Sequence, residues 1–210
     1  MKPGPNYVYK CPNCSNLLTK ASLMSGNTFG AKIFSDGKRI APMLPEFPNL
    51  TKCKKCNTIF WLSKLKEIGT FGWGADKNSD WQNADRAEFL EIDDYYDAIS
   101  KGIAENTQEE LLIRQHIWWA YNDRIRKGQE IFNDESDELR WIENVKKLKI
   151  LLDKSDINQK IMIAEINRNL GDFENCISII QSIDNNDLSW LKEIFLNECK
   201  RNNKWVIELN

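Results

Sequence analysis

Two short cysteine pairs constrain this chain of 210 residues more than any other feature of its sequence. The pairs are Cys11-Pro12-Asn13-Cys14 and Cys53-Lys54-Lys55-Cys56. In each C-x-x-C, one tight turn can direct two thiolates at a single ion, and two such turns supply the four sulfurs that structural zinc prefers. We therefore predict one zinc site formed by Cys11, Cys14, Cys53 and Cys56. Its closed shell leaves no position for water or substrate, which indicates a structural ion.

The segment between the pairs predicts a small β structure. It runs for 38 residues from Ser15 to Lys52, which is more than the spacing of about 15–20 common in this pattern. Residues 28–42 contain alternating apolar and polar side chains around Asp36-Gly37, which predicts a β-hairpin with a type I′ turn. Three prolines within residues 42–48 predict a stiff extended connection. The run Thr58–Leu62 is β-prone and is a candidate to pair with this hairpin.

Residues 7–66 resemble the zinc-ribbon families, in which two metal-binding knuckles cap a small antiparallel sheet. The resemblance rests on the four cysteines, Pro12 and the hairpin. The knuckles are also similar to those of rubredoxin-type proteins, which hold a redox-active iron in the same four-sulfur geometry, so iron is the alternative occupant. Ribbon knuckles usually carry glycine after the second cysteine. Here Ser15 and Asn57 stand at those positions, and asparagine tolerates a positive φ better than serine.

Two other roles for paired cysteines are disfavoured. A thioredoxin-like redox pair lies beside a βαβ unit, and the sequence pattern shows none. The N-terminal residues 1–5 are polar and contain two prolines, which predicts that no signal peptide is present and disfavours disulfides. No apolar stretch has the length of a membrane span. We expect a cytoplasmic protein without membrane contact, and the abundance of Asn, Ile and Lys is typical of an AT-rich bacterial genome.

From about residue 80 the hydrophobic period changes from about 2 to about 3.6 residues, which predicts helices. The first predicted helix carries its apolar face at positions 89, 92, 96, 99 and 103, with Ser79 and Gln82 as a capping box. Thr107 and Glu110 form the next box. The helices that follow are predicted at about 108–126, 136–153, 156–170, 172–183 and 187–202. The fold class is therefore α+β: a small antiparallel β zinc ribbon followed by an all-α, repeat-like (α-solenoid) domain.

Residues 157–183 resemble the tetratricopeptide repeat. Ala164 and Cys176 match its small packing residues, while Gly171 and Phe173 match its turn and aromatic. Gly171 is predicted to end one helix and Asp172 to cap the next. The resemblance implies a scaffold for protein complexes, although the other helices do not keep the repeat period of about 34 residues. We expect Cys176 and Cys199 to be buried small side chains.

The charge is divided unevenly between the two parts of the chain. Residues 1–66 contain 11 Lys or Arg and only two acids, whereas residues 67–210 contain 18 basic and 29 acidic side chains. A basic segment of this kind either meets phosphates or docks on the acidic helices of its own chain, and both alternatives stay open. A nucleic-acid interface would consist of Lys38, Arg39, Lys52, Lys54 and Lys55.

The sequence predicts three segments and no enzyme. They are a zinc ribbon at 1–66, a linker of alternating glycine and large apolar residues at 67–80, and a tetratricopeptide-like helical domain at 81–210. Phe71 and Trp73 in the linker are either partner-binding hot spots or a wedge between the domains. The single histidine, His116, has no nucleophile at helical spacing, and phosphate-binding glycine loops are absent. We expect a non-catalytic zinc-binding adaptor that binds a protein or peptide through its helices. Nucleic-acid binding by the basic ribbon is the alternative.

Overall fold

The chain builds two units whose segments interleave along the sequence. The structure is a computed structural model and describes residues 1–72 and 79–209. The β unit comprises residues 1–31 and 40–103, and the helical unit comprises residues 32–39 and 104–210. The predicted α+β class, with small antiparallel sheets followed by helices that pack in pairs, is confirmed. Among the described helices, none has both the length and the apolar character needed to span a membrane.

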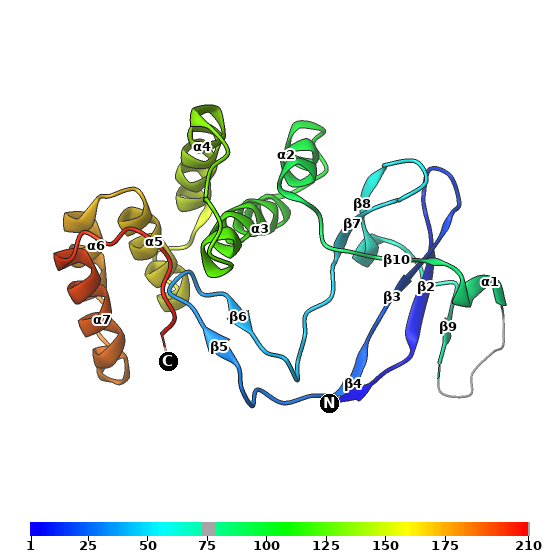
Figure 1. Cartoon of the computed structure of the whole chain (residues 1–210), viewed down its shortest axis with the longest axis horizontal. Helices are drawn as coiled ribbons and strands as arrows, with labels where there is room; N and C mark the ends of the chain where they lie inside the picture. The colour runs from blue at the N-terminus through cyan, green and yellow to red at the C-terminus, as the bar shows by residue number, and fades with distance from the viewer. Residues whose placement is uncertain (73–78, 210) are drawn as a thin grey trace. The chain divides into compact units, whose positions relative to one another are not determined.

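The β unit contains two hairpins that belong to different sheets (Figure 1). The first hairpin pairs β2 (Asn6–Lys10) with β3 (Leu17–Lys20), and the second pairs β7 (Leu50–Lys52) with β8 (Ile59–Trp61). The first sheet is completed by two short edge strands, β9 (Gly69–Phe71) beside β2 and β10 (Asp85–Arg86) parallel to β3. The remaining elements are β1 (Lys2–Pro3), which pairs with β4 (Leu23–Ser25), and the short 3-10 helix η1 (Leu62–Lys64).

The predicted strand at Thr58–Leu62 exists as β8, but its predicted partner is wrong. It pairs with β7, and not with the hairpin at 28–42. All three residues of β8 are buried, so this strand forms core rather than an exposed edge. The indole Nε1 of Trp61 donates a hydrogen bond of 3.1 Å to the carbonyl of Ile103, which fixes the end of the β unit against its own sheet.

The predicted helix from about residue 80 to Ile103 is also wrong. The structure has a short helix, α1 (Ser79–Gln82), then strand β10, and then α2 (Ile92–Ser100). The backbone between the two helices is hydrogen-bonded to the first sheet. The N–H of Ala87 donates to the carbonyl of Thr19 at 2.8 Å. The buried face of α2 consists of Ile92, Tyr95 and Ala98, whereas Phe89 is 46% exposed. A partner strand far away in sequence therefore overrides the local helical period.

The helical unit stacks five helices in chain order. Each helix packs on its successor, and Figure 1 shows this progression from α3 to α7. At the starts of the first four of these helices, a side chain accepts a hydrogen bond from a backbone amide, as is usual for N-caps. The cap of α3 is Asn106, which accepts from the N–H of Glu109, and not Thr107 as predicted. The helices are α3 (Thr107–Arg126), α4 (Glu135–Leu151), α5 (Ile157–Asn169), α6 (Phe173–Gln181) and α7 (Ser189–Lys200), with the 3-10 helix η2 (Asn186–Leu188).

The turn between α5 and α6 forms as the sequence predicts. Gly171 has a φ of +78°, and the N–H of Asp172 donates to the carbonyl of Asn167 at 2.8 Å, which closes α5 in a Schellman motif. Asp172 then caps α6 by accepting from the N–H of Asn175. Ala164 and Cys176 are fully buried in one apolar cluster, which also contains Cys199. Burial raises the pKa of both thiols, so they act as small core side chains.

The predicted hairpin at 28–42 forms β5 (Lys32–Ile33) and β6 (Arg39–Ile40), and its residues 32–39 belong to the helical unit. Its turn is not type I′, because that type needs a positive φ at both central residues, and in this turn only Gly37 has one. The N–H of Gly37 donates to the carbonyl of Phe34 at 2.9 Å, and the N–H of Phe34 donates to Lys38 at 3.0 Å. The loop is therefore three residues long, with Gly37 in the left-handed position.

The tip of this hairpin is polar, and it is nevertheless the most buried part of the hairpin. Ser35 and Asp36 are 1% and 0% exposed. Asp36 forms an ion pair with Arg126 and accepts a hydrogen bond of 2.8 Å from the amide of Asn122, both on α3. Ser35 donates at 2.7 Å to Glu165, which is paired with Arg168 on α5. These contacts join α3, α5 and the hairpin through charges that are shielded from water.

We predict that Asp36→Ala destabilises the protein by about 2–4 kcal/mol, because it leaves Arg126 buried with only one carboxylate, Asp123. The measurement is urea unfolding of the full chain, followed by helical circular dichroism. Glu143→Ala is the matched control, since it removes an exposed ion pair with Lys147 on α4 and should change stability far less. Equal losses in the two variants would contradict the importance of the buried pair.

Candidate metal centre

Each cysteine pair occupies the loop of one β-hairpin. Cys11 and Cys14 lie between β2 and β3, and Cys53 and Cys56 lie between β7 and β8. The two loops close with equivalent hydrogen bonds. The N–H of Cys11 donates to Asn16 at 2.8 Å and that of Cys53 donates to Thr58 at 2.9 Å. The first cysteine of each pair also accepts, from Ser15 at 3.0 Å and from Asn57 at 2.8 Å. The two knuckles are therefore the same local structure built twice.

Both knuckles need a left-handed residue directly after the second cysteine. Ser15 has a φ of +59° and Asn57 a φ of +58°. This region costs a residue with a Cβ about 1–2 kcal/mol, and asparagine tolerates it better than serine. Both residues thus adopt the backbone conformation that glycine usually has at this position of a zinc ribbon, although neither residue is glycine.

The four sulfur atoms surround a single point. They all lie within 4.8 Å of one another, with Cys11 Sγ 3.5 Å from Cys56 Sγ and Cys14 Sγ 3.7 Å from Cys53 Sγ. An ion held tetrahedrally with bonds of about 2.3 Å sets its sulfurs about 3.8 Å apart. The cluster therefore has the dimensions of a four-thiolate site for one metal ion. Among residues 1–72 and 79–209, no other group of His, Cys, Asp and Glu side chains converges in this way.

The electrostatics of the cluster favour a bound cation. Cys11 and Cys53 are 2% and 0% exposed, while Cys14 and Cys56 are half-buried. Burial raises the pKa of Cys11 to about 12, because a thiolate there loses its water. The hydroxyl of Thr58, 3.3 Å from the sulfur of Cys56, lowers the pKa of that thiol to about 5. Four thiolates so close together need a positive ion, and metal binding would deprotonate all four.

The sequence indicated Thr58 only as the start of a strand and not as part of the metal site. It lies two positions after Cys56, and its backbone carbonyl and its side chain both contact the knuckle. The equivalent position in the first knuckle is Asn16, whose amide donates at 2.8 Å to Asp85 on β10. The polar residue two places after each C-x-x-C is the signal that could have identified both positions.

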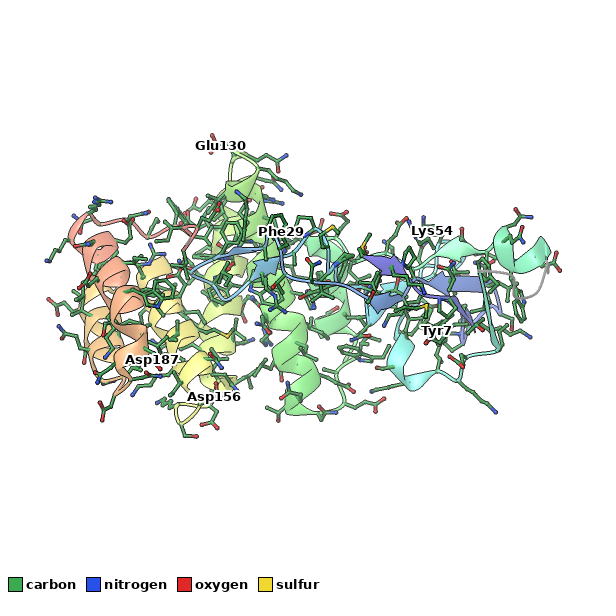
Figure 2. All side chains as sticks on the ribbon, turned by 90° about the horizontal axis from the view of Figure 1, so that it is seen from below. Tyr7, Phe29, Lys54, Glu130, Asp156 and Asp187 are labelled. Atoms are coloured by element: carbon green, nitrogen blue, oxygen red, sulfur yellow. The ribbon has the colours of Figure 1, made fainter. Side chains whose placement is uncertain are left out.

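The five predicted nucleic-acid residues do not form one free basic set. Lys38 pairs with Asp123 at 2.6 Å, Lys52 with Asp94 at 2.6 Å, and Lys54 with Glu88 at 2.8 Å. Lys54 projects from the turn between β7 and β8 (Figure 2). Arg39 and Lys55 are exposed. The set is also divided between the units, because Lys38 and Arg39 belong to the helical unit and the other three to the β unit.

The structure describes two of the other three predicted functional residues, Phe71 and His116. Phe71 is half-buried at the end of β9, where it pairs with Asn6, and Trp73 lies outside the described residues. His116 is largely buried, with its ring 5.5 Å from that of Trp119. Burial, together with the charge of Lys38, lowers the pKa of His116 to about 4, so the side chain is neutral at physiological pH. This environment suits a structural side chain.

The chain therefore has a β unit with four cysteines positioned to hold one metal ion, and a second unit of stacked helices. No family model, no curated protein and no solved structure matches it.

We predict that Ser15→Gly stabilises the β unit by about 0.5–1.5 kcal/mol, because glycine adopts a positive φ without steric cost. Chemical unfolding of the metal-loaded protein is the measurement. Ser25→Gly is the control, since Ser25 lies in β4 with an ordinary φ and should lose stability. A loss in Ser15→Gly as large as that in the control would show that the turn does not strain this residue.

We also predict that Cys14→Ser abolishes stoichiometric metal binding, whereas Cys176→Ser keeps it, because only Cys14 belongs to the sulfur cluster. Native mass spectrometry of the folded variants gives the ion count per chain. Full metal content in Cys14→Ser would contradict a four-sulfur site.

Proposed function

We propose that this chain is a non-catalytic adaptor, in which a zinc ion orders the β unit and the helical unit binds a protein or peptide. The observation that carries the proposal is the sulfur cluster: four thiol groups lie within 4.8 Å of one another around one point. Four protein ligands fill a tetrahedral shell, which suits a structural ion and leaves no position for a reacting water or substrate.

Zinc is the proposed ion, with iron as the alternative. Four thiolates in tetrahedral geometry suit both metals. The arrangement of the hairpins supports the structural role of zinc, because the ion would link two sheets that the described strands leave unpaired with each other. A reducing compartment such as the cytoplasm would keep these thiolates available, which agrees with the expected location.

The other reactive side chains support a non-catalytic role. Cys176 and Cys199 are buried and burial raises the pKa of each thiol, so at neutral pH they are protonated and weak nucleophiles. His116 is partly buried, and its lowered pKa keeps it neutral. None of these groups combines exposure with the activating pKa shift typical of a catalytic centre.

The helices provide the proposed binding surface. The α5–α6 pair carries the resemblance to the tetratricopeptide repeat, a family that mostly assembles protein complexes. Large apolar side chains are exposed on the helices at Ile150 (80%), Leu139 (60%) and Trp190 (49%). Of these, Trp190 is of the side-chain type most enriched among residues that carry binding energy at interfaces. Nucleic-acid binding stays the alternative, but the ion pairs of Lys38, Lys52 and Lys54 weaken it.

The proposal is tested by affinity capture with the zinc-loaded full chain and with Ile150→Ser and Trp190→Ser. We expect a stoichiometric protein partner that at least one of these variants loses while its circular dichroism is unchanged. Phe29→Ser is the matched control, because Phe29 is 86% exposed but lies outside the helices. Capture that survives both helical substitutions would contradict the surface. Salt-sensitive binding of RNA or DNA, lost on replacing Arg39 and Lys55, would favour the alternative.

A further inference from the structure

A cavity of about 300 Å³ lies in the helical unit, away from the sulfur cluster, among α4, α5 and α6. Three lysines line it: Lys149 from the last turn of α4, Lys154 from the loop that follows, and Lys160 from the first turn of α5. The apolar part of the wall is formed by Ile163 and Ile179. The cavity therefore combines three cationic groups with an apolar surface.

The three lysines lack carboxylate partners. Among the described residues, no Asp or Glu lies within ion-pair distance of Lys149, Lys154 or Lys160. The helical unit nevertheless has more acidic than basic residues, since residues 104–210 hold 20 acids and 15 Lys or Arg. Some lysines elsewhere in the unit are paired, as Lys147 is with Glu143 at 2.6 Å. Three lysines without a carboxylate partner in the described chain thus line one cavity of a unit that is acidic as a whole.

The nearby carboxylates are committed to backbone groups instead. Asp156, labelled at the start of α5 in Figure 2, accepts at 2.8 Å from the N–H of Gln159. Asp153 accepts at 2.8 Å from the N–H of Ser155, and Asp172 accepts from both the N–H and the side-chain amide of Asn175. These carboxylates act as caps and turn-formers, and they form no ion pair with the three lysines.

Two of the lysines are also held in place. Lys149 donates at 2.6 Å to the amide oxygen of Asn167, and the amide nitrogen of Asn167 donates at 2.7 Å to the carbonyl of Ile163. Asn167 is 0% exposed, so this pair forms a fixed part of the wall. Lys160 donates at 3.2 Å to the carbonyl of Ser182. Each ammonium keeps further N–H groups for another acceptor, since a lysine has three donors.

We propose that this cavity binds a small phosphorylated metabolite, with its phosphate monoester among Lys149, Lys154 and Lys160. A phosphate monoester carries a charge of about −1.5 to −2 and three strong acceptor oxygens, which matches three ammonium groups better than a single carboxylate does. The volume is at the lower limit of small-molecule pockets, about 300–1,000 Å³, so the body of the ligand is no larger than a simple sugar. Ile163 and Ile179 cover that body. This inference is independent of the zinc site and of the adaptor role.

The test is isothermal titration calorimetry of the metal-loaded full chain at constant ionic strength. The titrants are glucose 6-phosphate, inorganic phosphate and glucose, with a short 5′-phosphorylated RNA as a second source of the same phosphate group. We expect saturable binding of glucose 6-phosphate and of phosphate, and no binding of glucose. Lys154→Gln and Lys160→Gln should each weaken binding about ten- to a hundredfold, the effect of losing one charged hydrogen bond.

Lys147→Gln is the matched control, because it removes one lysine charge from α4 outside the cavity. It should leave the affinity within about twofold of that of the unsubstituted chain. The exposed Lys154 can be replaced without loss of a buried contact, so unfolding does not obscure the result. No saturable binding of either phosphate compound, equal affinities in Lys154→Gln and the unsubstituted chain, or binding of the RNA alone would each overturn the proposal.

Discussion

The convergence of four sulfurs is the interaction on which the β unit depends. Its two hairpins belong to different sheets, and within the described chain no strand of one is hydrogen-bonded to a strand of the other. They are joined by the cysteine cluster, by a small apolar core around Leu18, Phe60 and Leu62, and by a hydrogen bond from Lys20 to Asn49. Strands of two to five residues bury little surface, so a unit of this kind usually needs a metal or disulfide to be stable. An ion bound by all four cysteines would supply that link, and its binding energy would become folding energy.

In the helical unit, buried ion pairs and hydrogen bonds connect segments that are distant in the sequence. Its fold includes a hairpin from the N-terminal third of the chain, and the tip of this hairpin places Ser35 and Asp36 beside Glu165, Arg168 and Arg126. Buried charges of this kind add little net stability compared with apolar packing, but removing one partner is costly. The network therefore specifies where the hairpin lies more than it strengthens the fold. It also explains why the two units interleave along the sequence.

Local sequence patterns correctly predicted the features that depend on interactions between neighbouring residues. The C-x-x-C spacing identified the sulfur cluster, and Gly171-Asp172 identified the end of α5 and the cap of α6. The larger failures depend on contacts between distant residues. Residues 85–86 join β3 as a strand, so the helix predicted across them begins only at Ile92. Residues 32–39 of the hairpin belong to the helical unit because their hydrogen-bond and ion-pair partners are on α3 and α5, and no pattern within residues 28–42 reveals them. Likewise, a charge count shows that the N-terminal segment is basic, but it cannot show that Lys52 meets Asp94.

The most direct test of this account is amide hydrogen exchange of the full chain with and without zinc, under reducing conditions and at neutral pH. If the ion joins the two hairpins, its removal by a chelator should abolish protection in β2, β3, β7 and β8, while α3 to α6 keep theirs. Protection in the four strands that is the same with and without metal would contradict the account, because the apolar core alone would then hold the β unit together.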